Sequence, residues 1–405
     1  MRARAVLVWL ALAAAVAGGT AAPAASPAAS PGLASALRAA LAAPGVDPHS
    51  TAALVVDLRT GETVLAANER RPLAPASLEK LAVSFAALRV LGPEHRFVTD
   101  VAGTGFRSGT VWHGNLYLVG RGDPTLRPRD LRHLARRIAW SGIRHVTGRV
   151  VGDDSHFDSR RDAPGWKPSF LGIESPPLSA LALGGSEVRT ADGSARAAAE
   201  AFVRALRGAG VTVSHAARAG LAPAAAVRLA RDHSPPLRVV VGLLNRESDN
   251  LAAELLLKTL GTTVAERGST RAGATVVRRV LAEAGVPVAG LRIADGSGLS
   301  TLDRLSAQAV VGILRAAAAD PQLREPFRAS LAVAGVSGTL RTRLGARPTR
   351  GRVLAKTGTT NRSCALAGFV GRRYAFAVLH NGFPVPYWPA RIAQDRFVTL
   401  LARER

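Results

Sequence analysis

The sequence predicts an α+β fold, in which helices cover one antiparallel sheet. Two observations carry this prediction. Short apolar runs typical of strands occur near both ends of the 405-residue chain, at 52–57, 63–67, 352–356, 365–370 and 374–380. Runs with the apolar spacing of helices occupy much of the chain between them. Because strands from both ends can share a sheet only if the termini return to it, we expect the helices to pack on that sheet.

The first 32 residues are predicted to lie outside the folded part. Arginines at positions 2 and 4 precede an apolar run over 5–17 and then small residues, which is typical of an export signal at 1–22. That run is too short to span a bilayer. Residues 23–32 are rich in Ala, Pro and Ser and are predicted to be a tether. We therefore expect an exported protein with no stable membrane anchor after signal cleavage.

The remaining elements indicate a main domain with a large insert. We predict a first helix at 33–41 and a closing helix at 389–402, with Ile392, Val398 and Leu401 along one side. The stretch 97–233 differs, because a strand-like run, a helix and a Pro/Gly-rich segment follow one another there. It is predicted to be an inserted module of two small domains. The main domain is then discontinuous, over 33–96 and 234–405.

The composition limits the classes of function. The formal net charge is +24, carried almost wholly by arginine. A nucleic-acid binder is one interpretation of so basic a chain, but the export signal argues against nucleic acid as the partner. Anionic polymers of the cell envelope or a general bias towards arginine are the alternatives. Cys364 is the single cysteine, which excludes an intrachain disulfide, and it is predicted to be buried in a strand.

Three short motifs indicate one chemical site. They have the forms S-x-x-K, S-x-N and K-T-G and occupy residues 77–80, 248–250 and 356–358. Each alone has an ordinary explanation, such as a serine that caps a helix or a lysine before a glycine bend. All three in this order are far less expected by chance. Two of the four lysines of the chain lie in these motifs.

The first motif predicts an activated nucleophile. Ser77 precedes an apolar-periodic run, so it should lie at a helix N-terminus with Lys80 on the same face one turn later. A serine hydroxyl needs a base to take its proton, and a neutral amine can be that base. If Lys356 faces the same cleft, the two like charges disfavour each other, so that Lys80 can be neutral while Lys356 stays charged.

The other two motifs predict substrate contacts. Ser248 can relay a proton towards a leaving amine, and the Asn250 amide can hold a substrate amide. Lys356 and the hydroxyls of Thr357 and Thr359 can bind a terminal carboxylate. These groups need no metal and no cofactor.

The motifs and their spacing resemble the D-alanyl-D-alanine carboxypeptidase/endopeptidase family, the class C low-molecular-mass penicillin-binding proteins. The long gap between the first two motifs is similar, and so are four further segments, at 114–120, 122–124, 295–300 and 334–340. The resemblance implies a serine β-lactamase/penicillin-binding transpeptidase-like domain with its insert between the first two motifs.

The resemblance also implies the reaction. Ser77 would attack the carbonyl between two D-alanines of a peptidoglycan stem peptide, and penicillins would acylate it as covalent inhibitors. Lys80 would be the base and Ser248 the proton relay, with backbone N–H groups of Ser77 and Thr359 as the oxyanion hole. A β-lactamase and a non-catalytic wall-binding protein of the same fold are the alternatives.

Two departures from the family pattern lie where recognition of the stem-peptide side chain is expected. Thr301 and Asp303 stand where the family often has arginine and asparagine. Residues 360–362, which follow the K-T-G-T run, are more polar than the pattern predicts.

Overall fold

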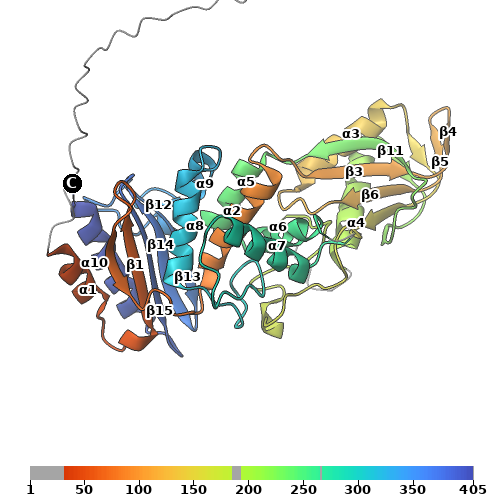
Figure 1. The fold of residues 1–405 in the computed structure, drawn as a ribbon. Coiled ribbons are helices and arrows are strands. Elements are labelled where there is room, and N and C mark those ends of the chain that lie inside the picture. Colours follow the sequence, from red (N-terminus) through yellow and green to blue (C-terminus); the bar gives the residue numbers. More distant parts are fainter. Residues whose placement is uncertain (1–31, 185–192, 265–266, 405) are drawn as a thin grey trace, which may run out of the picture.

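The computed structural model describes residues 32–184, 193–264 and 267–404 (Figure 1). The predicted signal and residues 23–31 of the predicted tether lie outside this range. One antiparallel sheet contains strands from both ends of the chain, in the order β12 (Ala332–Val333), β13 (Val353–Thr360), β14 (Ser363–Val370), β15 (Tyr374–Asn381), β1 (Thr51–Asp57) and β2 (Thr63–Ala67). The first long strand pairs with the last, from Thr51 opposite His380 to Asp57 opposite Tyr374. The predicted α+β fold is confirmed.

Both faces of this sheet are buried, which explains the continuous apolar runs of its strands. Alternate residues of β1 point to opposite faces, so Leu54 packs in one hydrophobic cluster and Val55 in another. The second cluster contains α1 (Leu33–Leu41) and α10 (Tyr387–Arg403), which lie together on one face. In α10, Val398 and Leu401 are buried as predicted, but the prediction for Ile392 is wrong because its side chain is 49% exposed.

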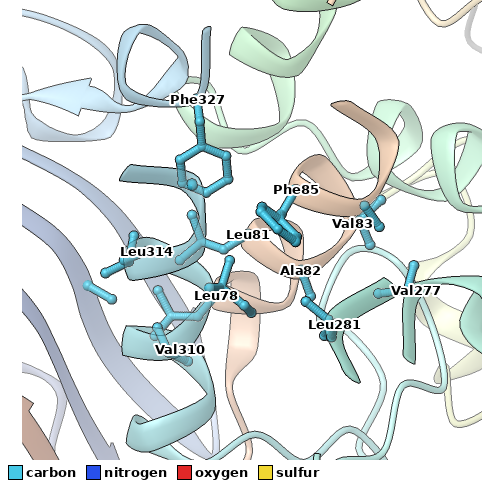
Figure 2. Close-up of a cluster of buried hydrophobic side chains, with 14 of the residues drawn as sticks. Leu78, Leu81, Ala82, Val83, Phe85, Val277, Leu281, Val310, Leu314 and Phe327 are labelled. Carbon is cyan, nitrogen blue, oxygen red and sulfur yellow. The ribbon is translucent and has the colours of Figure 1, made fainter. Parts of the chain in front are cut away.

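Six helices form the layer on the other face. They are α2 (Glu79–Leu91), α5 (Leu237–Asn245), α6 (Asn250–Gly261), α7 (Thr270–Glu283), α8 (Ala307–Ala319) and α9 (Arg324–Ser330). Helix α2 lies at the centre, and its residues from Glu79 to Leu88 are all buried. Figure 2 shows Phe85 of α2 among side chains of α7, α8 and α9. This packing on all sides fixes the N-terminus of α2, where Ser77 lies.

The stretch between α2 and α5 forms a separate body, which projects from the helical layer (Figure 1). A five-stranded sheet has the order β10 (Arg218–Ala219), β8 (Val150–Asp153), β6 (Leu116–Gly120), β3 (Val98–Gly103) and β11 (Val227–His233). A four-stranded sheet has the order β4 (Phe106–Ser108), β5 (Val111–His113), β7 (His145–Val146) and β9 (Thr212–Val213). Both sheets share one hydrophobic cluster with α3 (Pro128–Trp140) and α4 (Gly193–Gly208). The domain boundaries drawn from the sequence stay predictions.

One segment of this insert returns to the main body. After β8, Phe157 forms an isolated bridge with Gly268, and the Asp158 carboxylate pairs with the buried ammonium group of Lys258 in α6. The chain then passes through a short 3₁₀ turn, η3 (Pro168–Phe170). The insert thereby places residues 160–175 beside the helices that carry the motifs. Among the described residues, no helix is long and apolar enough to cross a membrane.

Candidate active site

Ser77 lies in a 3₁₀ turn, η2 (Ala76–Leu78), that leads directly into α2. The residue before it, Ala76, has φ of +48°, a strained conformation for a residue with a Cβ. One turn later Lys80 is fully buried, and its Nζ donates a hydrogen bond of 3.0 Å to Ser77 Oγ. The predicted nucleophile and base are therefore within reach of a proton transfer.

Lys80 has two further acceptors, contributed by distant parts of the chain. Its Nζ donates to Asn250 Oδ1 at 2.8 Å and to the backbone oxygen of Ser297 at 2.5 Å. Together with Ser77 Oγ they satisfy all three donors of an ammonium group. These three acceptors fix the position of the Lys80 amine beside Ser77.

Lys356 joins the second and third motifs. It lies in β13, and its Nζ donates hydrogen bonds of 2.8 Å to Ser248 Oγ and to the Thr357 backbone oxygen. Ser248 has φ of +62°, and the next residue, Asp249, caps α6 by accepting from Ala252 N at 2.8 Å. This turn directs the Ser248 side chain towards β13, so residues from all three motifs meet.

The K-T-G-T run lies along β13 beside the turn that carries Ser77. β12 pairs with β13 only at Leu354 and Ala355, and η2 packs on β13 beyond that point. A Cβ atom on Gly358 would lie 3.2 Å from Ser77 N and closer still to Pro75 O, so glycine allows this approach. The oxyanion hole formed by the N–H groups of Ser77 and Thr359 stays a prediction.

Thr357 Oγ1 donates a hydrogen bond of 2.9 Å to Thr339 Oγ1. Thr339 belongs to a short turn, η4 (Gly338–Leu340), in one of the segments that resemble the family. The contact fixes the Thr357 hydroxyl on the exposed side of the strand. Thr339 is a site residue that reasoning from the three motifs missed.

Burial changes the proton affinity of both lysines. Burial lowers the pKa of Lys80 to about 8, although nearby carboxyl groups, first Asp295 and then Glu254, oppose the change. Burial also lowers the pKa of Lys356 well below its usual value, and the charge of Lys80 adds to the effect. The two lysines repel as predicted, but the repulsion lowers the pKa of Lys356. The lowered pKa of Lys80 favours its role as a base, and the assignment of the neutral form to Lys80 and the charged form to Lys356 stays a prediction.

A buried turn over residues 295–300 presents the Ser297 oxygen to Lys80. Glu254 Oε1 accepts from the backbone N–H groups of Gly296 at 2.9 Å and Ser297 at 2.8 Å. Asp295 accepts from the N–H groups of Gly298 and Ser300 at 2.7 and 2.8 Å. Glu254 was missed by the motif reasoning. Its signal was an acidic residue four positions after Asn250, on the same face of α6.

A cleft opens beside Ser77. Its lining comes from the Ser77 turn, the 295–300 turn, the end of β13 and the returning segment of the insert, and includes Ala76, Gly298, Thr359, Glu174 and Phe383. Thr301 and residues 360–362 line the same cleft, so these departures from the family pattern face the space where a substrate can bind. Asp303 does not line it. It is buried, and its Oδ1 accepts from Ala294 N at 2.7 Å.

Comparison with known proteins identifies the family. The model of the D-Ala-D-Ala carboxypeptidase 3 (S13) family matches residues 33–189 and 177–403, which is most of the chain. The chain belongs to the S13 family. The family prediction made from the three motifs is thereby confirmed, and with it the assignment to the D-Ala-D-Ala carboxypeptidases.

Two relatives match over most of the chain. A D-alanyl-D-alanine carboxypeptidase of Actinomadura sp. (strain R39) is 32% identical, over 85% of this chain and 80% of that protein. Carboxypeptidase DacB of Mycolicibacterium smegmatis is 31% identical, over 81% of this chain and 75% of that protein.

The fold is also similar to a solved structure. Penicillin binding protein 4 (dacB) from Haemophilus influenzae matches with a TM-score of 0.79 at 22% identity, covering 92% of this chain and 98% of that one. The predicted penicillin-binding-protein fold is confirmed.

Proposed function

We propose that this chain is an exported serine-type D-Ala-D-Ala carboxypeptidase that acts on peptidoglycan stem peptides through an acyl-enzyme on Ser77. The observation that carries the proposal is the position of the buried Lys80 Nζ, 3.0 Å from Ser77 Oγ and 2.8 Å from Asn250 Oδ1, beside a cleft that the Ser77 turn and the end of β13 line. The description of the S13 family and the name of the Actinomadura relative supply D-Ala-D-Ala as the substrate class. Cleavage of the same bond type within a cross-link would add endopeptidase activity.

Acylation begins with proton transfer. Neutral Lys80 takes the proton of Ser77 Oγ, which attacks the carbonyl carbon between the two D-alanines. The negative charge on the carbonyl oxygen is stabilised by the N–H groups of Ser77 and Thr359, a contribution that is typically worth about 10²- to 10³-fold per donor. Lys356 with Thr357 binds the terminal carboxylate, and Asn250 holds the peptide amide.

Collapse of the tetrahedral intermediate breaks the peptide bond and releases the terminal D-alanine. Ser248, which accepts a hydrogen bond from Lys356, passes its proton to the leaving amine and is reprotonated with the proton that Lys80 took from Ser77, so Lys80 is neutral again. Water then attacks the ester carbonyl with Lys80 as base, and Ser77 regains its proton. A β-lactam would follow the first half of this route and remain as a covalent adduct on Ser77.

The test combines two substrates. The purified chain is incubated with a stem peptide that ends in D-Ala-D-Ala and, separately, with a fluorescent penicillin, and the products are weighed. Ser77→Ala should abolish D-alanine release and the covalent adduct while the protein remains folded. Unchanged cleavage by Ser77→Ala would contradict the proposal, and rapid turnover of the penicillin would favour a β-lactamase instead.

A further inference from the structure

One segment of the insert contacts two residues that each lie beside the proposed catalytic base. Trp166 Nε1 donates a hydrogen bond of 2.7 Å to Asp295 Oδ2. Eight positions on, the backbone oxygen of Glu174 accepts a hydrogen bond of 2.9 Å from Asn250 Nδ2. We call residues 164–174 the strap.

The first contact reaches Lys80 through the buried turn. Asp295 is fully buried, and its Oδ2 also accepts from Ser297 Oγ at 2.9 Å, while Oδ1 accepts from Gly298 N. The backbone oxygen between these two groups, Ser297 O, is an acceptor for Lys80 Nζ. Trp166 is thus one of the donors that hold the carboxylate around which this turn is built.

The second contact orients an amide. Asn250 must present Oδ1, not Nδ2, to Lys80, because an ammonium group only donates hydrogen bonds. The Glu174 oxygen accepts from Nδ2 and therefore selects the same orientation. The amide nitrogen has two hydrogens, so one remains for a substrate carbonyl.

The strap is itself held firmly against the main body. Ser300 Oγ donates to the Pro164 backbone oxygen at 2.7 Å. Gly165 has φ of +82°, and a Cβ there would collide with Ser300 Oγ. Within the strap, Glu174 N donates to Phe170 O at 2.9 Å, which fixes the direction of the Glu174 carbonyl. The strap cannot move without changing these contacts.

We propose that Trp166 and the Glu174 backbone are positioning groups for Lys80, so that the insert helps to place the base that activates Ser77. The inference rests on the proposed function and adds a role for the insert to it. Neither group touches the reacting atoms. They act through the Ser297 oxygen and the Asn250 oxygen, which set the direction of the Lys80 amine.

The charged groups around Lys80 set its pKa, and this pKa should change when the strap contacts are lost. Glu79, Asp249, Glu254 and Asp295 raise the pKa of Lys80 against burial, and Lys356 faces it from β13. The Ser297 oxygen stabilises the ammonium form, because a carbonyl accepts from it. A loosened turn should therefore lower the pKa of Lys80 further and place the amine less well for attack.

The test is the pH profile of acylation by a fluorescent penicillin in Trp166→Phe, which removes the N–H donor and keeps an aromatic ring. We expect the plateau rate to fall about tenfold, as for a lost hydrogen bond to a charged group. We also expect the rising limb of the profile to move to lower pH. Trp140→Phe is the matched control, because Trp140 is 79% exposed on α3 of the same insert, and its profile should equal that of the wild type.

If Trp166 had a purely structural role, Trp166→Phe would lower the fraction of active protein equally at every pH. The rising limb of the pH profile would then stay at the wild-type pH. A Trp166→Phe profile that matches the wild type in plateau and limb, or that falls uniformly, would overturn the inference. If Trp166→Phe does not fold, Ser300→Ala replaces it, since this change releases Pro164 O and the backbone N–H of residue 300 can still donate to Asp295, although Leu302 N also loses its acceptor. If folded Ser300→Ala shows a rising limb at the wild-type pH, this result would also contradict the role of the strap in positioning Lys80.

Failure of the two proposals can be told apart. Wild-type protein that forms no penicillin adduct contradicts the proposed function. Wild-type protein that acylates normally, together with an unchanged Trp166→Phe, contradicts the role of the strap alone.

Discussion

Lys356 Nζ and Ser248 Oγ lie 2.8 Å apart, although 108 positions separate the two residues in the sequence. The bond joins β13 to the turn before α6 and holds the buried Lys356 amine next to a hydroxyl. A substrate carboxylate that approaches Lys356 meets a donor that is already oriented, so little side-chain entropy is lost on binding.

Lys356→Ala should weaken binding of substrates that carry a free carboxylate. A hydrogen bond to a charged group contributes about 1.5–3 kcal/mol, so we expect KM for a D-Ala-D-Ala peptide to rise roughly 10- to 100-fold. The same peptide with its C-terminus amidated is the control, and its KM should change little between wild type and variant. Equal effects on both peptides would contradict the assignment of Lys356 to the carboxylate.

Lys80→Arg should retain the positive charge and lose the base. A guanidinium group stays protonated at any working pH, so it cannot take the Ser77 proton. Acylation by a fluorescent penicillin should fall by about 10²-fold or more, in the range typical of a lost general base. Thermal unfolding monitored by circular dichroism checks that the variant is folded. Normal acylation by folded Lys80→Arg would show that another group is the base.

Acylation should rise with pH through the pKa of Lys80. Burial lowers this pKa to about 8, and only the neutral amine accepts a proton, so the active fraction grows as pH increases through that value. One pH unit below it, only about a tenth of the molecules carry the neutral amine. Stopped-flow acylation rates across this interval provide the measurement. A rate that is flat from pH 6 to 9 would be incompatible with Lys80 as base.

Gly298→Ala should misplace Ser77. Gly298 has φ of +82°, and a Cβ there would collide with the backbone oxygen of Ala76, the residue before the nucleophile. Gly285→Ala is the matched control, since Gly285 has φ of +72° and open space around its Cβ position. The backbone strain should cost each variant about 1 kcal/mol of stability, and the collision with Ala76 adds a further cost in Gly298→Ala alone. Acylation should be lost in Gly298→Ala alone. Equal acylation rates in the two variants would show that the contact between residue 298 and Ala76 does not position Ser77.

Asp303→Asn should stabilise the protein at alkaline pH. Burial, with Asp295 nearby, raises the pKa of Asp303 well above its usual value. The folded state then binds a proton that the unfolded state releases, so stability falls as pH rises from the unfolded towards the folded pKa. Asparagine keeps the Oδ1 acceptor for Ala294 N and removes the titration.

The stability gain of Asp303→Asn should grow by up to about 1.4 kcal/mol per pH unit in this interval and vanish in acid. Asp162→Asn, at an exposed position, makes the same change of charge and should show no such trend. Melting temperatures at several pH values test the difference. A lower melting temperature for Asp303→Asn at pH 8 would mean that Asp303 is ionised there.

Local patterns predicted the elements that apolar periodicity defines. The strand expected at 52–57 corresponds to β1, which is a continuous apolar run because its residues are buried on both faces of the sheet. The strand expected at 63–67 corresponds to β2. β13 extends to Thr360, four residues beyond its predicted end, because pairing with β14 stabilises a polar and glycine-containing stretch. The strand propensity of the residues themselves does not reflect this pairing with β14.

The sequence also predicted the catalytic groups better than their surroundings. Ser77 and Lys80 are one helical turn apart, so their proximity follows from spacing alone. Trp166, Glu174 and Glu254 act through contacts between segments far apart in the chain, and a single sequence contains no spacing rule for such contacts. The exposure of Ile392 has a different origin, because helical spacing places it on the side of α10 opposite to the buried Leu401.

The pairing of β1 with β15 determines when the active site can assemble during synthesis of the chain. The ribosome makes Ser77 and Lys80 well before Lys356 and β15, the neighbour of β1. Such distant partners are slow to find each other. A nascent or truncated polypeptide that lacks β13, β14 and β15 has a nucleophile without an assembled cleft, so hydrolytic activity should begin only after these strands have been made and paired.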